Sequence, residues 1–382
     1  MVNIQEALAE VNAAAAARPD GVKHAPIVME AVLEAGALRA LAPYLQEKGY
    51  GEVVLVVDAN TWEAAGKQLA ANLEAAGAAF RVCTLAPNSQ GDVIADERTI
   101  VQLMLEAPLY VQALVAVGSG TIHDIVRFVC CQTGRDFISV PTAASVDGFT
   151  SVGAPIIVNG VKVTVPAIAP CAIFADLDVL AAAPQRLTAA GFADMLGKFT
   201  SLADWRFSNE LAGEPFCPLA YELTEQALAS CIEAVDEISR GSHAGVAILM
   251  EALLLSGWSM LLVGHSRPAS GGEHHLSHHF EMAYLKEGRR QLLHGAKVGV
   301  ASVLLAGLYR ERLADAYPGI YGELPQPDLL RAWLREAGGP ADPADIGLAD
   351  ALIAEALQEA HKLRDRYTGL KHLALQAEGA AG

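Results

Sequence analysis

The stretch Ala113-Leu-Val-Ala-Val-Gly-Ser-Gly-Thr-Ile-His-Asp124 decides the fold class of this chain. Its first five residues are apolar without alternation, which is typical of a strand buried on both faces of a parallel sheet. The glycines that follow allow a tight turn into a helix, predicted over residues 121–131, and let the backbone approach a pyrophosphate. The third glycine of the usual dinucleotide fingerprint is missing, since His123 occupies that position, so a simple tight turn is the alternative.

Further strand and helix patterns repeat on both sides of this stretch. Helices are predicted at residues 2–17, 61–75 and 94–106, the first of them Ala-rich and expected to be loosely attached. Apolar runs predict strands at residues 53–57, 80–85, 137–140 and 171–175. Strands alternating with helices indicate βαβ units and a parallel sheet. Asn159-Gly160 stands between two further apolar runs, 156–158 and 161–165, and predicts a hairpin.

The pattern changes after about Pro184. Strand signals stop, and Ala/Leu-rich segments predict helices at 187–209, 219–239, 246–263, 276–287 and 297–313, followed by three shorter ones. The chain has 382 residues, more than the roughly 250–300 at which a single core usually stops growing. We therefore expect an α/β domain with a Rossmann-like parallel sheet over residues 1–184 and an all-α domain over residues 185–382.

Composition limits the compartment and the partners of the protein. The net charge of −17 would repel nucleic acid, although one local basic pocket for a small phosphate is compatible with it. The six cysteines show no CxxC spacing, which favours a reducing compartment. We see no signal-peptide pattern and no uninterrupted apolar run of the roughly 18–20 residues of a membrane span. We expect a cytoplasmic protein that is not embedded in a membrane and does not bind nucleic acid.

Histidines are concentrated in one segment, since five of the 11 lie within residues 270–294. His274 and His278 stand four apart, so a helix would place both on one face. His294 begins the next apolar segment. Imidazoles on two neighbouring helices suit a borderline metal such as zinc. The alternative is a solvent-exposed polar helix whose histidines bind no metal.

A third metal ligand is predicted in Gly191-Phe-Ala-Asp194-Met-Leu-Gly-Lys198. Asp194 and Lys198 stand four apart and could form a surface ion pair, which would stabilise the helix by roughly 0.2–0.5 kcal/mol. The apolar neighbours indicate a mostly buried helix instead. A buried carboxylate needs a partner, and a metal is one.

Two loops that follow predicted strands carry further polar candidates. Asp58 follows the strand at 53–57, where an acid either holds ribose hydroxyls or caps the next helix. The segment Pro141-Thr-Ala-Ala-Ser-Val-Asp147-Gly-Phe-Thr-Ser151 follows the strand at 137–140. Small hydroxyl residues with one acid fit a ligand-binding loop, and an ordinary turn with Asp147 as its Asx residue is the alternative.

Five motifs of this chain occur in the same order in the sn-glycerol-1-phosphate dehydrogenases, namely residues 118–124, 141–148 and 191–198, then Gly272-Glu-His-His-Leu-Ser-His278 and His294-Gly295. The chain resembles this family, and most of all its bacterial branch. The resemblance spans roughly residues 53–301. The wider superfamily contains glycerol dehydrogenase, iron-type alcohol dehydrogenases and dehydroquinate synthase. The resemblance implies a dehydroquinate synthase-like fold, a homodimer, and reversible metal-dependent reduction of dihydroxyacetone phosphate to sn-glycerol 1-phosphate with NADH or NADPH.

The resemblance also implies roles for individual residues. Asp194, His274 and His294 correspond to the ligands of one divalent metal, zinc or nickel. Asp147, Asp194 and His278 correspond to residues that face the substrate. His275 and His279 have no role in the family, and we expect them at the surface or behind the ligands. The positions that match the nicotinamide cofactor are Asp58, Gly118, Ser119, Gly120, Thr121, Ile122, Asp124, Thr142, Ala143, Ala144, Ser145 and Ser151.

Two expectations rest on local charge. Lys198 and Lys297 are our candidates for binding the substrate phosphate, because both lie one turn or less from proposed metal ligands. A phosphate dianion in a protein of charge −17 needs nearby cations. Asp58 would repel a 2′-phosphate, which predicts a preference for NADH.

Three alternative functions remain: a glycerol dehydrogenase, a carbocycle-forming synthase and a non-catalytic cofactor-binding protein. A turnover assay distinguishes them.

Overall fold

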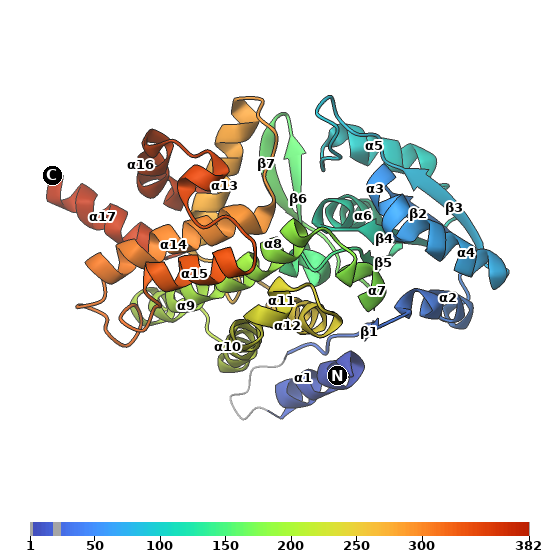
Figure 1. Cartoon of the computed structure of the whole chain (residues 1–382), viewed down its shortest axis with the longest axis horizontal. Helices are drawn as coiled ribbons and strands as arrows, with labels where there is room; N and C mark the ends of the chain where they lie inside the picture. The colour runs from blue at the N-terminus through green and yellow to red at the C-terminus, as the bar shows by residue number, and fades with distance from the viewer. Residues whose placement is uncertain (1–2, 18–23, 382) are drawn as a thin grey trace.

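The computed structural model describes residues 3–17 and 24–381. An α/β part and a helical part lie side by side in it (Figure 1). Residue 2, the predicted start of the first helix, lies outside the described residues.

Six parallel strands form one sheet in the order β1-β8-β5-β4-β2-β3. The five sheet strands predicted from apolar runs are all present, within one residue at each end. β1 was not predicted, because its two terminal glutamates leave only three apolar residues between them. The strands are β1 (Glu30–Glu34), β2 (Glu52–Val57), β3 (Ala79–Thr84), β4 (Ala113–Gly118), β5 (Asp136–Pro141) and β8 (Ala172–Asp176).

Alternate residues of the strands pack against helices on opposite faces of the sheet. Val53, Leu55 and Val57 pack with α2 (Leu41–Lys48) and α4 (Lys67–Ala75). Val54 and Val56 pack with α5 (Glu97–Glu106) and α6 (Gly120–Thr133). The predicted helix at 61–75 is formed by α3 (Ala59–Thr61), a π-helical turn (Trp62–Gly66) and α4. Burial on both faces contributes roughly 1.5–3 kcal/mol per large apolar side chain, which is why the central strands are apolar throughout.

The strand order places the ends of β2 and β4 next to each other. From β2 the chain continues outward to β3, and then it returns to the other side of β2 to form β4 and β5. Neighbouring strands from which the chain departs in opposite directions leave a crevice outside their carboxyl ends, where ligands of α/β sheets bind. Asp58 and Gly118 both follow at this edge.

The predicted hairpin is present as β6 (Gly153–Val158) and β7 (Val161–Pro166), which pair antiparallel. Asn159 and Gly160 both have positive φ, 52° and 75°, as a tight two-residue turn requires. The hairpin extends toward the helical part, where Lys162 Nζ lies 2.8 Å from Glu281 Oε2.

Helices make up the rest of the chain, and no strand follows β8 among the residues up to 381. The predicted helix at 187–209 is in fact two helices divided at Gly197, whose carbonyl accepts a hydrogen bond from Thr200 Oγ1. The predicted helix at 219–239 is likewise divided at Ala234. The helices are α7 (Leu177–Ala181), α8 (Gln185–Leu196), α9 (Lys198–Ala212), α10 (Pro218–Glu233), α11 (Val235–Ser239), α12 (His243–Val263), α13 (Gly272–Lys286), α14 (His294–Arg312), α15 (Pro327–Glu336), α16 (Asp350–Glu359) and α17 (Gly369–Ala381).

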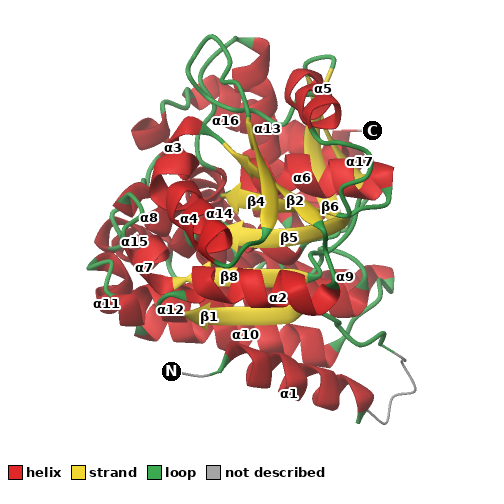
Figure 2. Cartoon of the chain, turned by 90° about the vertical axis from the view of Figure 1, so that its right-hand side faces the viewer, coloured by secondary structure: helices red, strands yellow, loops and turns green. Residues whose placement is uncertain are grey.

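The first helix, α1 (Ile4–Ala16), is not loosely attached, contrary to the sequence-based expectation. Its apolar residues at helical spacing, among them Leu8 and Val11, are buried in the same core cluster as α12. The Asn12 side chain also bonds both the backbone N–H and the carbonyl of Ile27. Figure 2 shows α1 beyond the edge strand β1.

One helix, α12, is long and apolar enough to cross a membrane by length and composition. Its mean hydropathy is 2.0, but 67% of the apolar window is buried inside the fold. It packs against α10, α11 and α7, so its apolar character is explained by its place in the core.

Stability should depend on pH through His123, which is fully buried in α6. Its Nδ1 lies 2.9 Å from Ser119 O and its Nε2 2.8 Å from Ser139 Oγ, and burial lowers its pKa to about 3. The native ring therefore stays neutral while the unfolded ring binds a proton below about pH 6.5. Stability present above pH 6.5 is then lost as pH falls, by up to about 1.4 kcal/mol per unit.

Urea denaturation of wild type and His123→Asn at pH 7 and pH 5 measures this contribution. The wild type should lose up to about 2 kcal/mol more than the variant between the two values. Equal losses in both proteins would contradict the assignment to His123.

Candidate metal and substrate site

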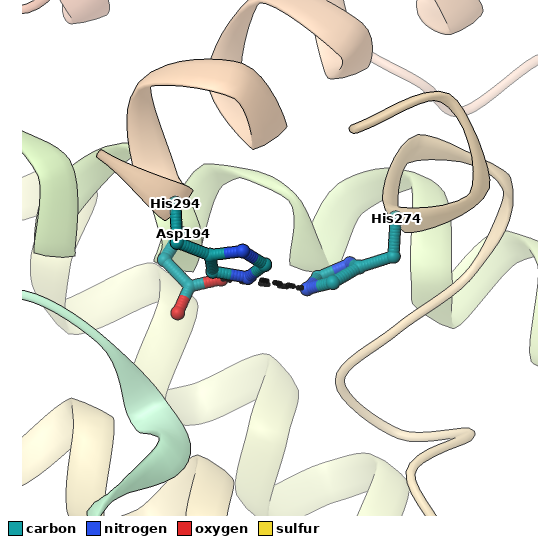
Figure 3. A group of neighbouring side chains, drawn as sticks. All are labelled: Asp194, His274 and His294. Atoms are coloured by element: carbon teal, nitrogen blue, oxygen red, sulfur yellow. Dashed lines mark hydrogen bonds and ion pairs between the residues drawn. The ribbon is translucent and has the colours of Figure 1, made fainter. Parts of the chain in front are cut away.

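Three helices bring the predicted metal ligands together. One ligand atom from each of Asp194 (α8), His274 (α13) and His294 (α14) lies within 4.8 Å of the other two (Figure 3). The Nε2 atoms of the two histidines are 3.2 Å apart. Asp194 Oδ1 lies 3.7 Å from His274 Nε2 and 4.0 Å from His294 Nε2.

The donor set fits a divalent metal. His274 Nδ1 is 2.7 Å from Glu273 Oε1, and Glu273 also accepts hydrogen bonds from Gly271 N–H and Thr200 Oγ1. Because the carboxylate accepts, Nδ1 of His274 carries the proton, and Nε2 has a free lone pair aimed at the other ligands. Burial lowers the pKa of His274 and His294 well below the usual value, so both rings are neutral. A carboxylate behind a neutral histidine is the usual outer support of a metal ligand.

Two glycines allow the close helix approaches that build this cluster. A Cβ on Gly191 would lie 2.0 Å from the carbonyl oxygen of Ala144, and one on Gly295 would lie 1.8 Å from that of Ala190. Since these neighbours are backbone atoms, no side chain is tolerated at either position. The loop after β5 and the start of α14 therefore both rest directly on α8, next to Asp194.

Lys198 lies between the two acids of the site. Its Nζ is 2.8 Å from Asp147 Oδ2, 3.4 Å from Asp194 Oδ1 and 3.0 Å from Ala269 O. The surface ion pair considered for Asp194 and Lys198 is wrong, because both side chains are fully buried. Burial alone would lower the pKa of Lys198, but the two carboxylates outweigh it and raise the pKa. All three ammonium protons have protein acceptors, which leaves none for a substrate phosphate.

Asp147 is held from several sides and is not a simple turn residue. Its backbone N–H donates to Asp194 Oδ2 at 3.0 Å, and its carboxylate accepts from Ser256 Oγ at 2.8 Å as well as from Lys198. The loop after β5 is therefore fixed to the metal cluster from the α/β side.

The remaining histidines of α13 have different surroundings. The ring centroid of His278 lies 6.4 Å from those of both His274 and His294. His279 pairs with Glu355 at 3.3 Å near the surface. His275 is fully buried, so a surface position is wrong for it.

The predicted cofactor loops gather at the carboxyl edge of the sheet. Thr142 N–H donates to Gly118 O at 2.9 Å, which joins the loop after β5 to the loop after β4. Asp58 follows β2, and its carboxylate caps α3 by accepting from Thr61 N–H, so the capping interpretation is confirmed. Ser119, Gly120 and Thr121, at the start of α6, are partly exposed there.

Other predicted cofactor positions are occupied by protein contacts. Asp124 forms an ion pair with Arg127 at 2.9 Å, and Ser151 Oγ accepts from Gly153 N–H. The side chains of Ile122, Ala143, Ala144 and Ser145 are buried.

Three charged residues around the cluster, Glu281, Lys162 and Arg364, were not predicted from the sequence. Glu281 Oε2 binds both Lys162 of the hairpin and Lys297, each at 2.8 Å, so Lys297, which was predicted to bind the phosphate, is in an ion pair. Arg364 reaches His278 from a C-terminal segment that carries no recognisable motif. No local signal marks Lys162 or Arg364, because only the tertiary fold brings them to the site.

The comparisons with known proteins define the class first. Residues 32–184 match the family model described as iron-containing alcohol dehydrogenase. The fold is similar to that of a probable glycerol dehydrogenase from Sinorhizobium meliloti 1021 (TM-score 0.70, 20% identity, 90% of this chain and 91% of that chain). It is equally similar to glycerol dehydrogenase from Schizosaccharomyces pombe (TM-score 0.70, 19% identity, 90% and 84%). The chain thus has the fold of these dehydrogenases, and its α/β part matches the iron-containing alcohol dehydrogenase model.

Curated relatives narrow the class. Glycerol-1-phosphate dehydrogenase [NAD(P)+] of Bacillus subtilis (strain 168) is 48% identical, with 92% of each chain covered. The enzyme of the same name from Bacillus licheniformis is 46% identical over 92% of this chain and 90% of its own. That of Methanosarcina mazei is 33% identical, with 83% of each covered. The chain belongs to the glycerol-1-phosphate dehydrogenase family, and the resemblance found in the sequence is confirmed.

Metal affinity should depend on Glu273, which fixes the proton of His274. Glu273→Gln removes the negative acceptor, and we expect zinc or nickel affinity to fall by about 10- to 100-fold. Competition with a chelator measures this in purified protein. Glu355→Gln is the matched control, because Glu355 pairs with His279, which lies on the same helix as His274 but outside the cluster. Undiminished affinity in Glu273→Gln would show that this carboxylate does not support the ligand.

Proposed function

We propose that the chain catalyses the reversible, metal-dependent reduction of dihydroxyacetone phosphate to sn-glycerol 1-phosphate with NADH or NADPH. The observation that carries this proposal is the cluster of Asp194, His274 and His294 beside the loop after β5. That loop lies at the edge of the sheet where α/β proteins bind nucleotides. Relatives at 46–48% identity carry the corresponding name.

The residues divide the work between them. A divalent metal held by the cluster supplies Lewis acidity toward the substrate's carbonyl oxygen. Lys198 holds Asp147 and Asp194 in fixed positions, and Asp147 faces the substrate. Arg364 Nη2 lies 3.4 Å from His278 Nδ1. Since a guanidinium only donates, Nδ1 accepts, and the proton of the neutral His278 ring sits on Nε2, where it serves the substrate oxygen.

The two parts of the chain serve different ligands in this proposal. Residues 1–184 bind the nicotinamide cofactor at the crevice between β2 and β4, and residues 185–382 bind metal and substrate. The register of β2 with β4 supports the first assignment, because it brings Asp58 and Gly118 to adjacent strand ends. Three ligands on α8, α13 and α14 support the second.

We further propose that the protein is a cytoplasmic homodimer that binds no nucleic acid. The net charge of −17 and six free cysteines support the compartment and the lack of nucleic-acid binding. Exposed apolar side chains on and after α5, such as Leu105 and Leu109, offer a surface for a second copy. Light scattering of the purified protein distinguishes the dimer from a monomer.

The decisive assay compares two ketones on metal-loaded protein. We expect NADH oxidation with dihydroxyacetone phosphate at a kcat/KM well above that with dihydroxyacetone. The product should not be consumed by an enzyme specific for sn-glycerol 3-phosphate. Equal activity on both ketones would indicate a glycerol dehydrogenase. No turnover of either would leave a synthase or a non-catalytic protein.

Cofactor preference should depend on the charge of Asp58. We expect kcat/KM for NADH to exceed that for NADPH, because the carboxylate repels a 2′-phosphate. Asp58→Asn should reduce the discrimination, while asparagine preserves the helix cap and thus the local fold. Equal kcat/KM for both cofactors in the wild type would refute the preference without affecting the site.

A further inference from the structure

Two arginines of the C-terminal segment lie beside the site without acidic partners. Arg364 Nη1 is 3.1 Å from Ser270 Oγ, and Arg366 Nη2 is 3.0 Å from Ser266 Oγ. The Nη1 atom of Arg366 is buried and has no acceptor within residues 3–17 and 24–381. None of the carboxylates described there lies within ion-pair distance of either guanidinium. Largely buried arginines normally have such a partner, since an unpaired buried charge is costly.

The lysines around the cluster differ from these arginines in this respect. Lys198 is neutralised by Asp147 and Asp194. Lys162 and Lys297 both bind Glu281. Lys162 and Lys297 thus share one carboxylate, whereas Arg364 and Arg366 contact none in the described part of the chain.

The surroundings of Arg366 also contain more positive charge than contacting carboxylates offset. Burial, with Arg364 and Arg267 nearby, lowers the pKa of Arg366 to about 10. Two carboxylates, Glu273 and Glu214, act on Arg366 from beyond ion-pair distance. Glu273 already accepts from His274, Thr200 and Gly271, and Glu214 pairs with Arg267 at 2.6 Å. The two guanidinium groups thus remain available to an anion from outside.

We propose that Arg364 binds the phosphate of the substrate, with Ser270 and His278 beside it and Arg366 adding positive potential from behind. This inference rests on the proposed function. Arg364 contacts His278, whose ring is next to both metal-binding histidines, so a three-carbon ketone bound at the cluster would extend its phosphate past His278 toward Arg364. A planar guanidinium matches phosphate oxygens with two parallel hydrogen bonds. Specificity for a phosphorylated ketone would then come from the C-terminal segment and not from the lysines next to the ligands.

The test measures both ketones with Arg364→Ala and Arg364→Lys. For Arg364→Ala we expect KM for dihydroxyacetone phosphate to rise about 10- to 100-fold. The ratio of kcat/KM for dihydroxyacetone phosphate to that for dihydroxyacetone should fall with it, because any loss through His278 acts on both ketones alike. Arg364→Lys should recover part of the loss. Lys362→Ala is the matched control, because it removes an exposed positive charge two residues away that pairs with Glu359, and its KM should match wild type.

Two outcomes would overturn the inference. One is an unchanged KM for dihydroxyacetone phosphate in Arg364→Ala. The other is an equal loss with both ketones, which would mean that Arg364 only supports the fold around Ser270 and His278. If the wild type turns over neither ketone, the proposed function fails, and calorimetric titration with inorganic phosphate decides. Binding by wild type that Arg364→Ala weakens would support the phosphate site, and equal or undetectable binding would overturn it.

Discussion

The carboxylate of Asp194 is the group on which the arrangement of this protein depends. It is fully buried, and a buried charge is tolerated only where it is surrounded by donors or cations. Its Oδ2 accepts from the backbone of Asp147, and its Oδ1 faces Lys198 and two imidazoles. These partners come from the loop after β5 and from three helices. Satisfying one side chain therefore fixes the sheet relative to the helical part.

Charge is distributed unevenly around that group. A protein of net charge −17 that handles an anionic substrate must concentrate positive charge where the anion binds. The lysines near the cluster all form ion pairs with internal carboxylates, which makes them part of the structure. The guanidinium groups of Arg364 and Arg366 contact serine hydroxyls and, for Arg364, the His278 ring, but no carboxylate of the described residues. Metal binding and anion binding are thus supplied by different segments, the first by α8, α13 and α14 and the second by residues near the C-terminus.

The sequence predicts those features that local pattern determines. Apolar runs identified the central strands, and the order of motifs identified Asp194, His274 and His294 before the fold brought them together. Periodicity alone predicted one helix across Gly197, because apolar spacing continues where the backbone changes direction. The edge strand β1 was missed, since glutamates frame its short apolar centre. Glu281, Lys162 and Arg364 could not be predicted, because their roles arise from contacts between distant segments that leave no local signal.

The position of α1 has a consequence for the order of folding during synthesis. Its apolar face belongs to the same core cluster as α12, and His24 Nδ1 lies 2.8 Å from the carbonyl of Leu262, 238 residues further along the chain. At a translation rate of about 5–20 residues per second, roughly 10–50 seconds separate the emergence of these two segments from the ribosome. During that interval the apolar stripe of α1 can pack against β1, but the part of its core cluster that α12 supplies is missing. The contact between His24 and the end of α12 is thus among the last to form.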